Sequence, residues 1–180
     1  MKTDTTKQWI IDATLNLLKK KSYSDITIGE ITNRAKLGRR TFYRHFKSKE
    51  EVIEVISLVL IDDFTEKLLE KNAKSFDEIM QCYFEFWELN IENLLLLKKA
   101  RLLYYIEENI VDLVTRIALR IGHIPNDVEN AVQILQNHKY EFAFKLAGFW
   151  KLTLVWSDEI PRKTPIEMSQ IITEFMGVVR

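Results

Sequence analysis

Residues 27–51 read TIGEITNRAKLGRRTFYRHFKSKEE, and these residues predict the fold of the N-terminal part of the chain. It opens with Thr27 and Glu30 at the spacing of a capping box, in which a hydroxyl and a carboxylate satisfy the first backbone N–H groups of a helix. Two short helices are expected, over residues 28–35 and 39–46, with a turn of only a few residues between them. Such a short turn makes the helices cross steeply, which predicts a helix-turn-helix.

The second of these helices has one apolar face, and its other faces are polar. Phe42 and Phe46 are four residues apart, so they share one face and are expected to pack against Ile28, Ile31 and Leu37. The other faces carry Arg39, Arg40, Thr41, Tyr43 and Arg44. Arginine pairs with guanine edges in the major groove, while tyrosine and threonine reach phosphates or a thymine methyl group. The sequence therefore predicts that this helix enters the major groove of DNA.

The distribution of charge supports a polyanionic partner for this part of the chain only. The formal net charge of all 180 residues is zero. Residues 1–50 nevertheless hold 12 lysines and arginines against 5 acidic residues, a net of +7, and the remainder carries −7. A basic block on a neutral protein is the pattern expected when one domain binds nucleic acid. An ordinary solvated charged surface would give the same count.

These residues resemble a known family. The run ITIGEI over residues 26–31, Ala35 and the run RRTFYRHFKSKEE over residues 39–51 resemble the N-terminal signature of the TetR/AcrR family of transcription regulators. The resemblance covers about residues 6–60. It implies an all-helical dimer, usually a repressor, whose C-terminal domain often binds an inducer.

The resemblance also assigns roles to single residues. It implies that Arg39, Arg40 and Tyr43 face the bases. The residues that it places on the DNA backbone are Thr27, Thr41, His45 and Lys49.

The chain departs from the family at three positions near the turn. Lys36 stands where glycine is common, Gly38 where serine is common, and Arg40 where a small residue is common. A residue other than glycine in a left-handed turn costs about 1 kcal/mol. These departures leave the operator sequence open, while DNA binding is still expected.

The rest of the chain is also expected to be helical. Only 3 prolines and 5 glycines interrupt it, and apolar residues recur at helical spacing. Further S/T-x-x-E starts at Ser48, Ser75 and Thr164 predict a long helix to about residue 70, a helix from residue 76 and a last helix from residue 165. The predicted fold class is all-α, with an N-terminal three-helix helix-turn-helix DNA-binding domain over residues 1–50. A C-terminal helical ligand-binding and dimerisation domain over residues 51–180 follows.

Aromatic residues are concentrated in the C-terminal part, where 12 of the 20 lie between residues 80 and 160. Aromatic side chains on several helices line apolar pockets and offer hydroxyl and indole N–H groups as polar contacts. The candidate ligand-binding residues are Tyr83, Trp87, Tyr104 and Tyr105. No distinctive charged cluster accompanies them, so a small apolar ligand is expected. The same residues could instead simply fill a core.

The last two helices, expected over residues 127–156 and 165–178, resemble the dimerisation element of the family. The candidate dimerisation residues are Phe142, Phe149, Trp156, Ile171 and Phe175. Two such helix pairs would form an intermolecular four-helix bundle in a homodimer. The alternative is that these residues are buried within one subunit.

Several other classes find no support in the sequence. There is no phosphate-binding glycine loop, no H-E-x-x-H motif and no Cys/His cluster, so neither an enzyme, a metal site nor a cofactor is expected. Cys82 is the single cysteine and is expected to be a small buried apolar residue. No signal peptide or bilayer-spanning run is visible, and a cytoplasmic protein is expected.

The sequence thus predicts a dimeric DNA-binding regulator of a palindromic operator in double-stranded DNA. A repressor released by a small apolar ligand is the leading hypothesis. The alternatives are an activator or co-activator of the same fold, or a helical protein-interaction module that no longer reads DNA.

Overall fold

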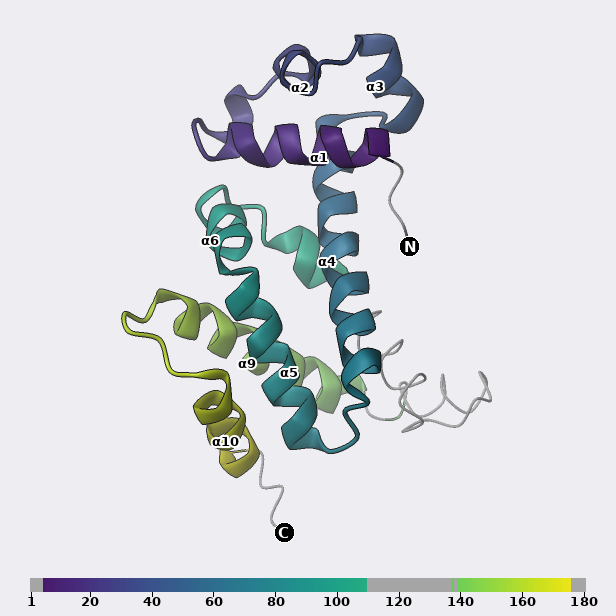
Figure 1. The fold of residues 1–180 in the computed structure, drawn as a ribbon. Coiled ribbons are helices and arrows are strands. Elements are labelled where there is room, and N and C mark those ends of the chain that lie inside the picture. Colours follow the sequence, from purple (N-terminus) through teal and green to yellow (C-terminus); the bar gives the residue numbers. More distant parts are fainter. Residues whose placement is uncertain (1–4, 110–136, 138, 176–180) are drawn as a thin grey trace. The chain divides into compact units, whose positions relative to one another are not determined.

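The computed structural model describes residues 5–109, 137 and 139–175, and within these ranges it is helical with no strand. This confirms the all-α prediction for the described residues. The elements are α1 (Thr5–Leu18), the short 3-10 helix η1 (Tyr23–Asp25), α2 (Ile28–Arg34), α3 (Arg39–His45), α4 (Lys49–Lys71), α5 (Phe76–Leu89), α6 (Ile91–Lys99), α9 (Lys139–Asp158) and α10 (Pro165–Phe175) (Figure 1). They belong to two compact units, which are described separately.

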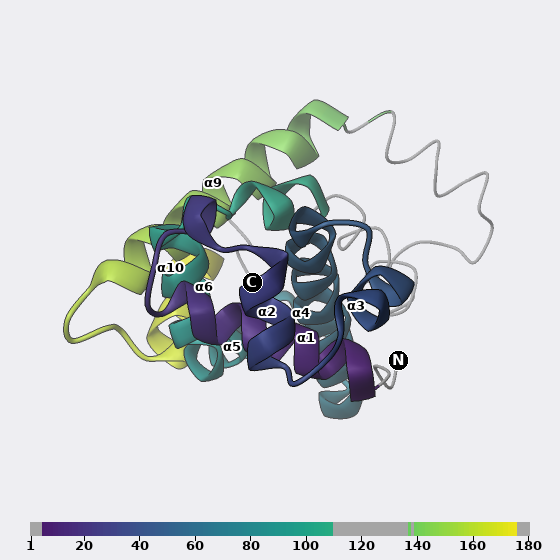
Figure 2. The same cartoon turned by 90° about the horizontal axis from the view of Figure 1, so that it is seen from above.

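The first unit contains Met1–Asp62 and Glu92–Asn109. Here α2 packs against both α1 and α3, and Figure 2 shows the three helices together from above. The side chains that this arrangement removes from water are Ile10, Ile26, Ile31, Phe42, Phe46, Val52 and Ile53, each at most 1% exposed. Burial of these apolar groups is the main force that holds three short helices in place.

Helix starts follow the capping chemistry that the sequence predicts. The Thr27 and Ser75 hydroxyls accept from the backbone N–H groups of Glu30 and Glu78, and both glutamates reach back to complete the box. Thr164 and Glu167 make the same contacts before α10, with Pro165 as its first residue. Each cap stabilises its helix by about 1 kcal/mol.

Three helix ends share a left-handed residue other than glycine, which the sequence indicated only at Lys36. Lys36, Asn72 and Arg101 have positive φ angles of 56°, 51° and 60°. After α2, the N–H of Leu37 donates to the carbonyl of Thr32 at 2.9 Å, which closes a Schellman motif around Lys36. Equivalent backbone bonds surround Asn72 and Arg101. Non-glycine residues thus stop α2, α4 and α6 in the left-handed conformation that glycine usually supplies.

The second unit contains Asp63–Ile91 and Ile110–Arg180, and α5 is its central described helix. α10 packs along α5. On α5, Phe84 meets Trp156 of α9 with ring centroids 5.2 Å apart, and Tyr83 meets Phe149 at 4.5 Å. Phe64, from the second half of α4, packs edge-on against Tyr83 at 5.5 Å. Aromatic side chains therefore form the core of this unit.

The expected helix boundaries agree with the structure to within a few residues up to residue 91. α6 ends at Lys99, and helical residues resume at 104–109. Residues 110–136 lie outside the described ranges, and with them the start of the helix expected over residues 127–156. None of the described helices is long and apolar enough to cross a membrane.

Candidate nucleic-acid interface

The recognition helix α3 is anchored through one face. Phe42 and Phe46 are 0% and 1% exposed, with ring centroids 5.9 Å apart, as the helical spacing predicts. Tyr43 packs edge-on against Phe42 at 5.6 Å but remains 58% exposed. Arg39, Arg40 and Arg44 are exposed as well. The apolar face of α3 is therefore packed against the fold, and its opposite face presents cationic and aromatic side chains to solvent.

The side chains expected to face the bases make few hydrogen bonds or ion pairs within the described residues. Among the described residues, Arg39, Arg40 and the Tyr43 hydroxyl have no side-chain hydrogen bond or ion-pair partner. The Arg44 guanidinium lies 3.5 Å from His45 Nε2. Thr41 is half-buried near the start of the helix. Donors without internal partners are free to exchange water for base edges or phosphates.

The Lys49 ammonium is not free to bind a phosphate, because it is hydrogen-bonded within the fold. Its ammonium donates to the carbonyl oxygens of Tyr23 at 2.9 Å, Ser24 at 3.3 Å and Ile26 at 2.9 Å. An ammonium has three N–H donors, so these carbonyls use all of them. In this conformation Lys49 holds the α1–α2 connection against the start of α4. The role that family resemblance gives it, a contact to the DNA backbone, would require these bonds to break.

Thr27 is likewise engaged in the fold. Its hydroxyl accepts from the Glu30 backbone N–H at 3.3 Å and donates to the Glu30 carboxylate at 2.9 Å. Lys21 pairs with the other carboxylate oxygen of Glu30 at 2.7 Å. These hydrogen bonds, the one from Lys21 first, lower the pKa of Glu30 to about 2. Thr27 and Glu30 thus fix the start of α2, and any phosphate contact of Thr27 would be additional.

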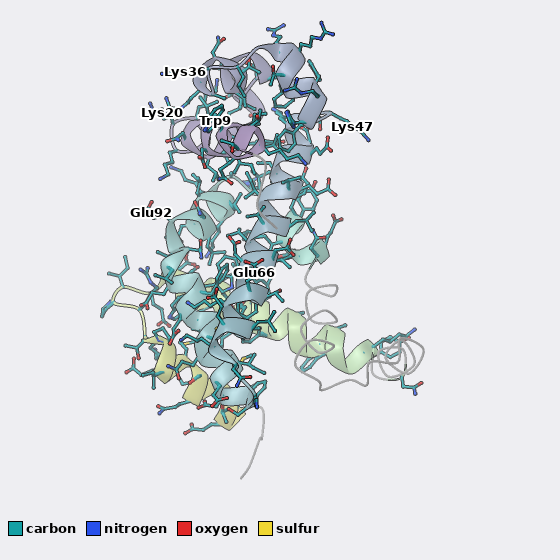
Figure 3. All side chains as sticks on the ribbon, turned by 45° about the vertical axis from the view of Figure 1, so that its right-hand side comes forward. Trp9, Lys20, Lys36, Lys47, Glu66 and Glu92 are labelled. Atoms are coloured by element: carbon teal, nitrogen blue, oxygen red, sulfur yellow. The ribbon has the colours of Figure 1, made fainter. Side chains whose placement is uncertain are left out.

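Two further cations lie on this domain at positions that were not assigned to DNA contact from the sequence. Lys36, in the left-handed turn, and Lys47, just after α3, are both exposed and project away from the helices (Figure 3). In the sequence, both lysines belong to the basic block of residues 1–50 that predicts DNA binding. Both flank α3, so they extend the basic surface on either side of the recognition helix.

A shallow groove of about 870 Å³ lies between α1 and α2. It is lined by Trp9, Asp12, Ala13, Asn16, Leu17, Glu30, Asn33, Arg34, Ala35 and Lys36. Trp9 is 51% exposed there. The lining residues include both acidic and basic side chains. The sequence of α1 did not predict a groove here.

The four candidate ligand-binding residues fall into two units. Tyr83 and Trp87 belong to the second unit and are 7% and 5% exposed. The Tyr83 hydroxyl lies 3.0 Å from that of Thr153, and burial raises its pKa. Tyr104 and Tyr105 belong to the first unit, with their ring centroids 3.9 Å apart. Tyr83 and Trp87 are thus described within the second unit, and Tyr104 and Tyr105 within the first.

The candidate dimerisation residues also divide. Trp156 is 1% exposed, and its indole N–H donates to the Lys163 carbonyl at 2.8 Å. Phe149 packs on Tyr83 and Phe84, so both aromatics contribute to the core of their own unit. Ile171 and Phe175 are 38% and 87% exposed, and the side chain of Phe142 lies outside the described set.

No group of three or more His, Cys, Asp and Glu residues that could hold a metal ion occurs among the described residues. The titratable groups of the helix-turn-helix serve as caps, ion pairs or exposed cations. This arrangement is suited to binding an anionic polymer whose groove is wide enough to admit a helix.

The capped helix α2 is followed by the short helix α3, which two phenylalanines anchor to the fold. α3 exposes three arginines and a tyrosine. This arrangement defines a helix-turn-helix of the DNA-binding type. Residues 10–56 match the bacterial regulatory proteins of the tetR family. This N-terminal part of the chain is therefore similar to the DNA-binding domain of tetR-family regulators. The match covers the whole helix-turn-helix and the first part of α4.

Among solved structures, the fold is similar to that of the dihydroxyacetone kinase operon activator DhaS, with a TM-score of 0.52 and 18% sequence identity. The likeness covers 96% of this chain and 94% of that one. At this identity it supports the fold of both units. The search of curated protein sequences gives no match.

Proposed function

We propose that the chain is a homodimeric regulator that reads a palindromic operator through α3 of each subunit. The observation that carries this proposal is the exposure of Arg39, Arg40 and Tyr43 on a helix that Phe42 and Phe46 anchor. A two-fold dimer presents two such helices to half-sites about one helical turn apart. Lys36, Lys47 and the other cations of the basic block supply contacts to phosphate.

The proposed dimer surface is the exposed apolar part of α9 and α10, and its occupant is a second copy of the chain. Phe144 is 81% and Phe175 87% exposed, and Ala147 and Gly148 are exposed on the same helix as Phe144. Large apolar side chains in water favour association, and small residues allow helices to approach closely. This surface is expected to bury Ile171 and Phe175 together with their symmetry mates.

The proposed regulatory ligand is a small apolar molecule in the aromatic core of the second unit. Tyr83 and Trp87 lie in this core, and the buried Trp87 indole N–H has no partner that meets hydrogen-bond geometry, its interaction with the Tyr83 hydroxyl being a weak one. A ligand with one acceptor atom would satisfy that N–H. α4 supplies residues to both units, so a ligand that favours one arrangement of α4 would change the population of the DNA-binding form.

Two directions of regulation remain candidates. A repressor released by its ligand is the form usual in the family that the signature resembles. An activator or co-activator is the second candidate, because the solved structure with a similar fold is named an operon activator. Both directions use the same DNA interface.

In vitro selection from random duplex DNA tests the proposal, at an ionic strength near 0.15 M. The expected result is a palindrome with half-sites about 10 base pairs apart. Tyr43→Ala should lose the sequence preference while remaining a folded dimer, and Lys74→Ala, an exposed cation of the second unit, should retain it. A folded wild-type dimer that enriches no motif would contradict DNA reading and favour a protein-interaction module.

A further inference from the structure

Gly29 lies in the first turn of α2, directly against the guanidinium of Arg39, the first residue of α3. A Cβ atom built on Gly29 would lie 3.0 Å from Arg39 Nη2 and 3.9 Å from Arg39 Cζ. The only other atom within 4 Å among the three nearest is Thr27 Oγ1, at 3.8 Å. The arginine expected to read bases thus rests on bare backbone of the neighbouring helix.

We propose that Gly29 is a specificity-determining residue, because its lack of a side chain sets the direction from which Arg39 enters the major groove. This inference rests on the proposed function, in which Arg39 contacts a base pair. Gly29 itself touches no base and acts as a positioning residue through Arg39.

The fold gives no other reason for glycine at this position. Gly29 is an ordinary helical residue, with no φ in the left-handed region. Glycine inside a helix is less stable than alanine, because it loses more conformational freedom on folding. The capping box of α2 uses Thr27 and Glu30 and places no demand on the residue between them. The close approach of Arg39 is therefore the described contact that a side chain would disturb.

No polar contact within the described residues holds Arg39 in place instead. The Glu30 carboxylate, one residue from Gly29, already accepts from Lys21 at 2.7 Å and from Thr27. The described neighbour that limits where the guanidinium can lie is therefore the backbone at Gly29. A methyl group 3.0 Å away is closer than ordinary van der Waals contact, so it would displace this flexible side chain rather than α2.

Displacement matters because a bidentate contact from arginine to guanine requires both nitrogens to lie in the plane of the base. A shift of the guanidinium weakens the contact and reduces discrimination at one base pair. Contacts from Arg40, Tyr43 and the flanking lysines do not depend on Gly29. The expected change is therefore confined to one position in each half-site.

A double-mutant cycle tests the inference on the full-length protein. Gly29→Ala, Arg39→Ala and the double variant are titrated against the selected operator and against operators with single base-pair changes. Gly29→Ala is expected to weaken operator binding about tenfold, the order of a damaged bidentate contact. The lost preference should fall at the base pair whose recognition Arg39→Ala removes. In the Arg39→Ala background, Gly29→Ala should change affinity less than about twofold.

Gly38→Ala is a control for the added methyl group alone, because a Cβ there meets no atom within 4 Å. Gly38 is the N-cap of α3 and alanine is a poorer cap, so the folded fraction is measured alongside, and the preference among base pairs should be unchanged. Thermal unfolding of Gly29→Ala should not fall below that of the wild type, which excludes a folding defect. A wild-type motif with unchanged binding by Gly29→Ala, or an equal loss in both backgrounds, overturns this inference alone. Failure of the wild type to select any motif overturns the proposed function, and the inference with it.

Discussion

The Lys49 ammonium donates a hydrogen bond to the Tyr23 carbonyl oxygen at 2.9 Å and lies 4.5 Å from the centre of the Tyr23 ring. The two residues are 26 positions apart, at the first residue of α4 and in the α1–α2 connection. Glu50 adds a second link, since the Tyr23 hydroxyl donates to its carboxylate at 3.1 Å. The start of α4 is therefore bound to the helix-turn-helix by side chains as well as by the chain itself.

Lys49→Ala should destabilise the N-terminal unit by about 1 kcal/mol. Hydrogen bonds from a charged donor contribute roughly 1.5–3 kcal/mol, and the half-buried position of Lys49 reduces that contribution. Urea denaturation followed by tryptophan fluorescence measures the change, because Trp9 lies in this unit. DNA affinity should fall mainly through the loss of folded protein.

Lys47→Ala is the control for this substitution, because Lys47 is an exposed cation two residues away. It should leave stability unchanged and reduce the dependence of DNA binding on salt by about one phosphate contact. If Lys49→Ala behaves in the same way, Lys49 contacts phosphate on DNA and its bonds to the carbonyls are not retained there.

Glu30→Gln should make unfolding less dependent on pH in acid. Hydrogen bonds from Lys21 and Thr27 lower the pKa of Glu30 from 4.5 to about 2 in the folded chain. A carboxyl with a lowered folded pKa stabilises the fold above its unfolded pKa, and this stabilisation is lost as pH falls from about 4.5 towards 2. Denaturation midpoints of wild type and Glu30→Gln should therefore differ near neutral pH and converge across this window. A constant difference throughout the window would contradict the lowered pKa.

Lys36→Gly should stabilise the chain, although it shortens a side chain at the surface. Lys36 has a φ of 56°, which costs roughly 1 kcal/mol for a residue with a Cβ. Glycine removes that cost, while its greater freedom in the unfolded state offsets part of the gain. A net increase of about 0.5 kcal/mol is expected. Lys36→Ala removes the same charge but keeps the strain, so equal stabilities of the two variants would show that the backbone is not strained.

The sequence predicted those parts of the structure that depend on neighbouring residues. The capping boxes at Thr27 and Ser75 need only a hydroxyl and a glutamate three residues apart, and both are present. The burial of Phe42 and Phe46 follows from their spacing on a helix. For this reason the helix-turn-helix, its boundaries and the exposed faces of α3 were all predictable.

Features that depend on distant contacts were not predictable. In the sequence, Lys49 is indistinguishable from the other cations of the basic block. The three carbonyl oxygens that accept its hydrogen bonds come close to it only in the folded chain. Arg101 ends α6 in a conformation that the sequence marks with neither glycine nor proline. The division of Tyr83 and Tyr104 between two units likewise depends on contacts between residues far apart in the sequence.

Phe175→Glu should convert the proposed dimer to a folded monomer. Phe175 is 87% exposed at the end of α10, so a charge there costs little within one subunit but would be buried in a dimer without a partner. Light scattering over a range of concentrations measures the mass, and circular dichroism checks the fold. Leu89→Glu, at a position 78% exposed on α5, is the matched control and should remain dimeric.

Trp156→Ala should behave in the opposite way, although Trp156 belongs to the same predicted dimerisation element. Its side chain is 1% exposed and packs on Phe84, so its loss should cost about 3–5 kcal/mol of stability. Dissociation would then accompany unfolding, and the two transitions would coincide in calorimetry and light scattering. A stable, folded monomer of Trp156→Ala would instead show that this tryptophan lies in the interface. A dimer that survives both Phe175→Glu and Phe144→Glu would place the interface away from the exposed residues of α9 and α10.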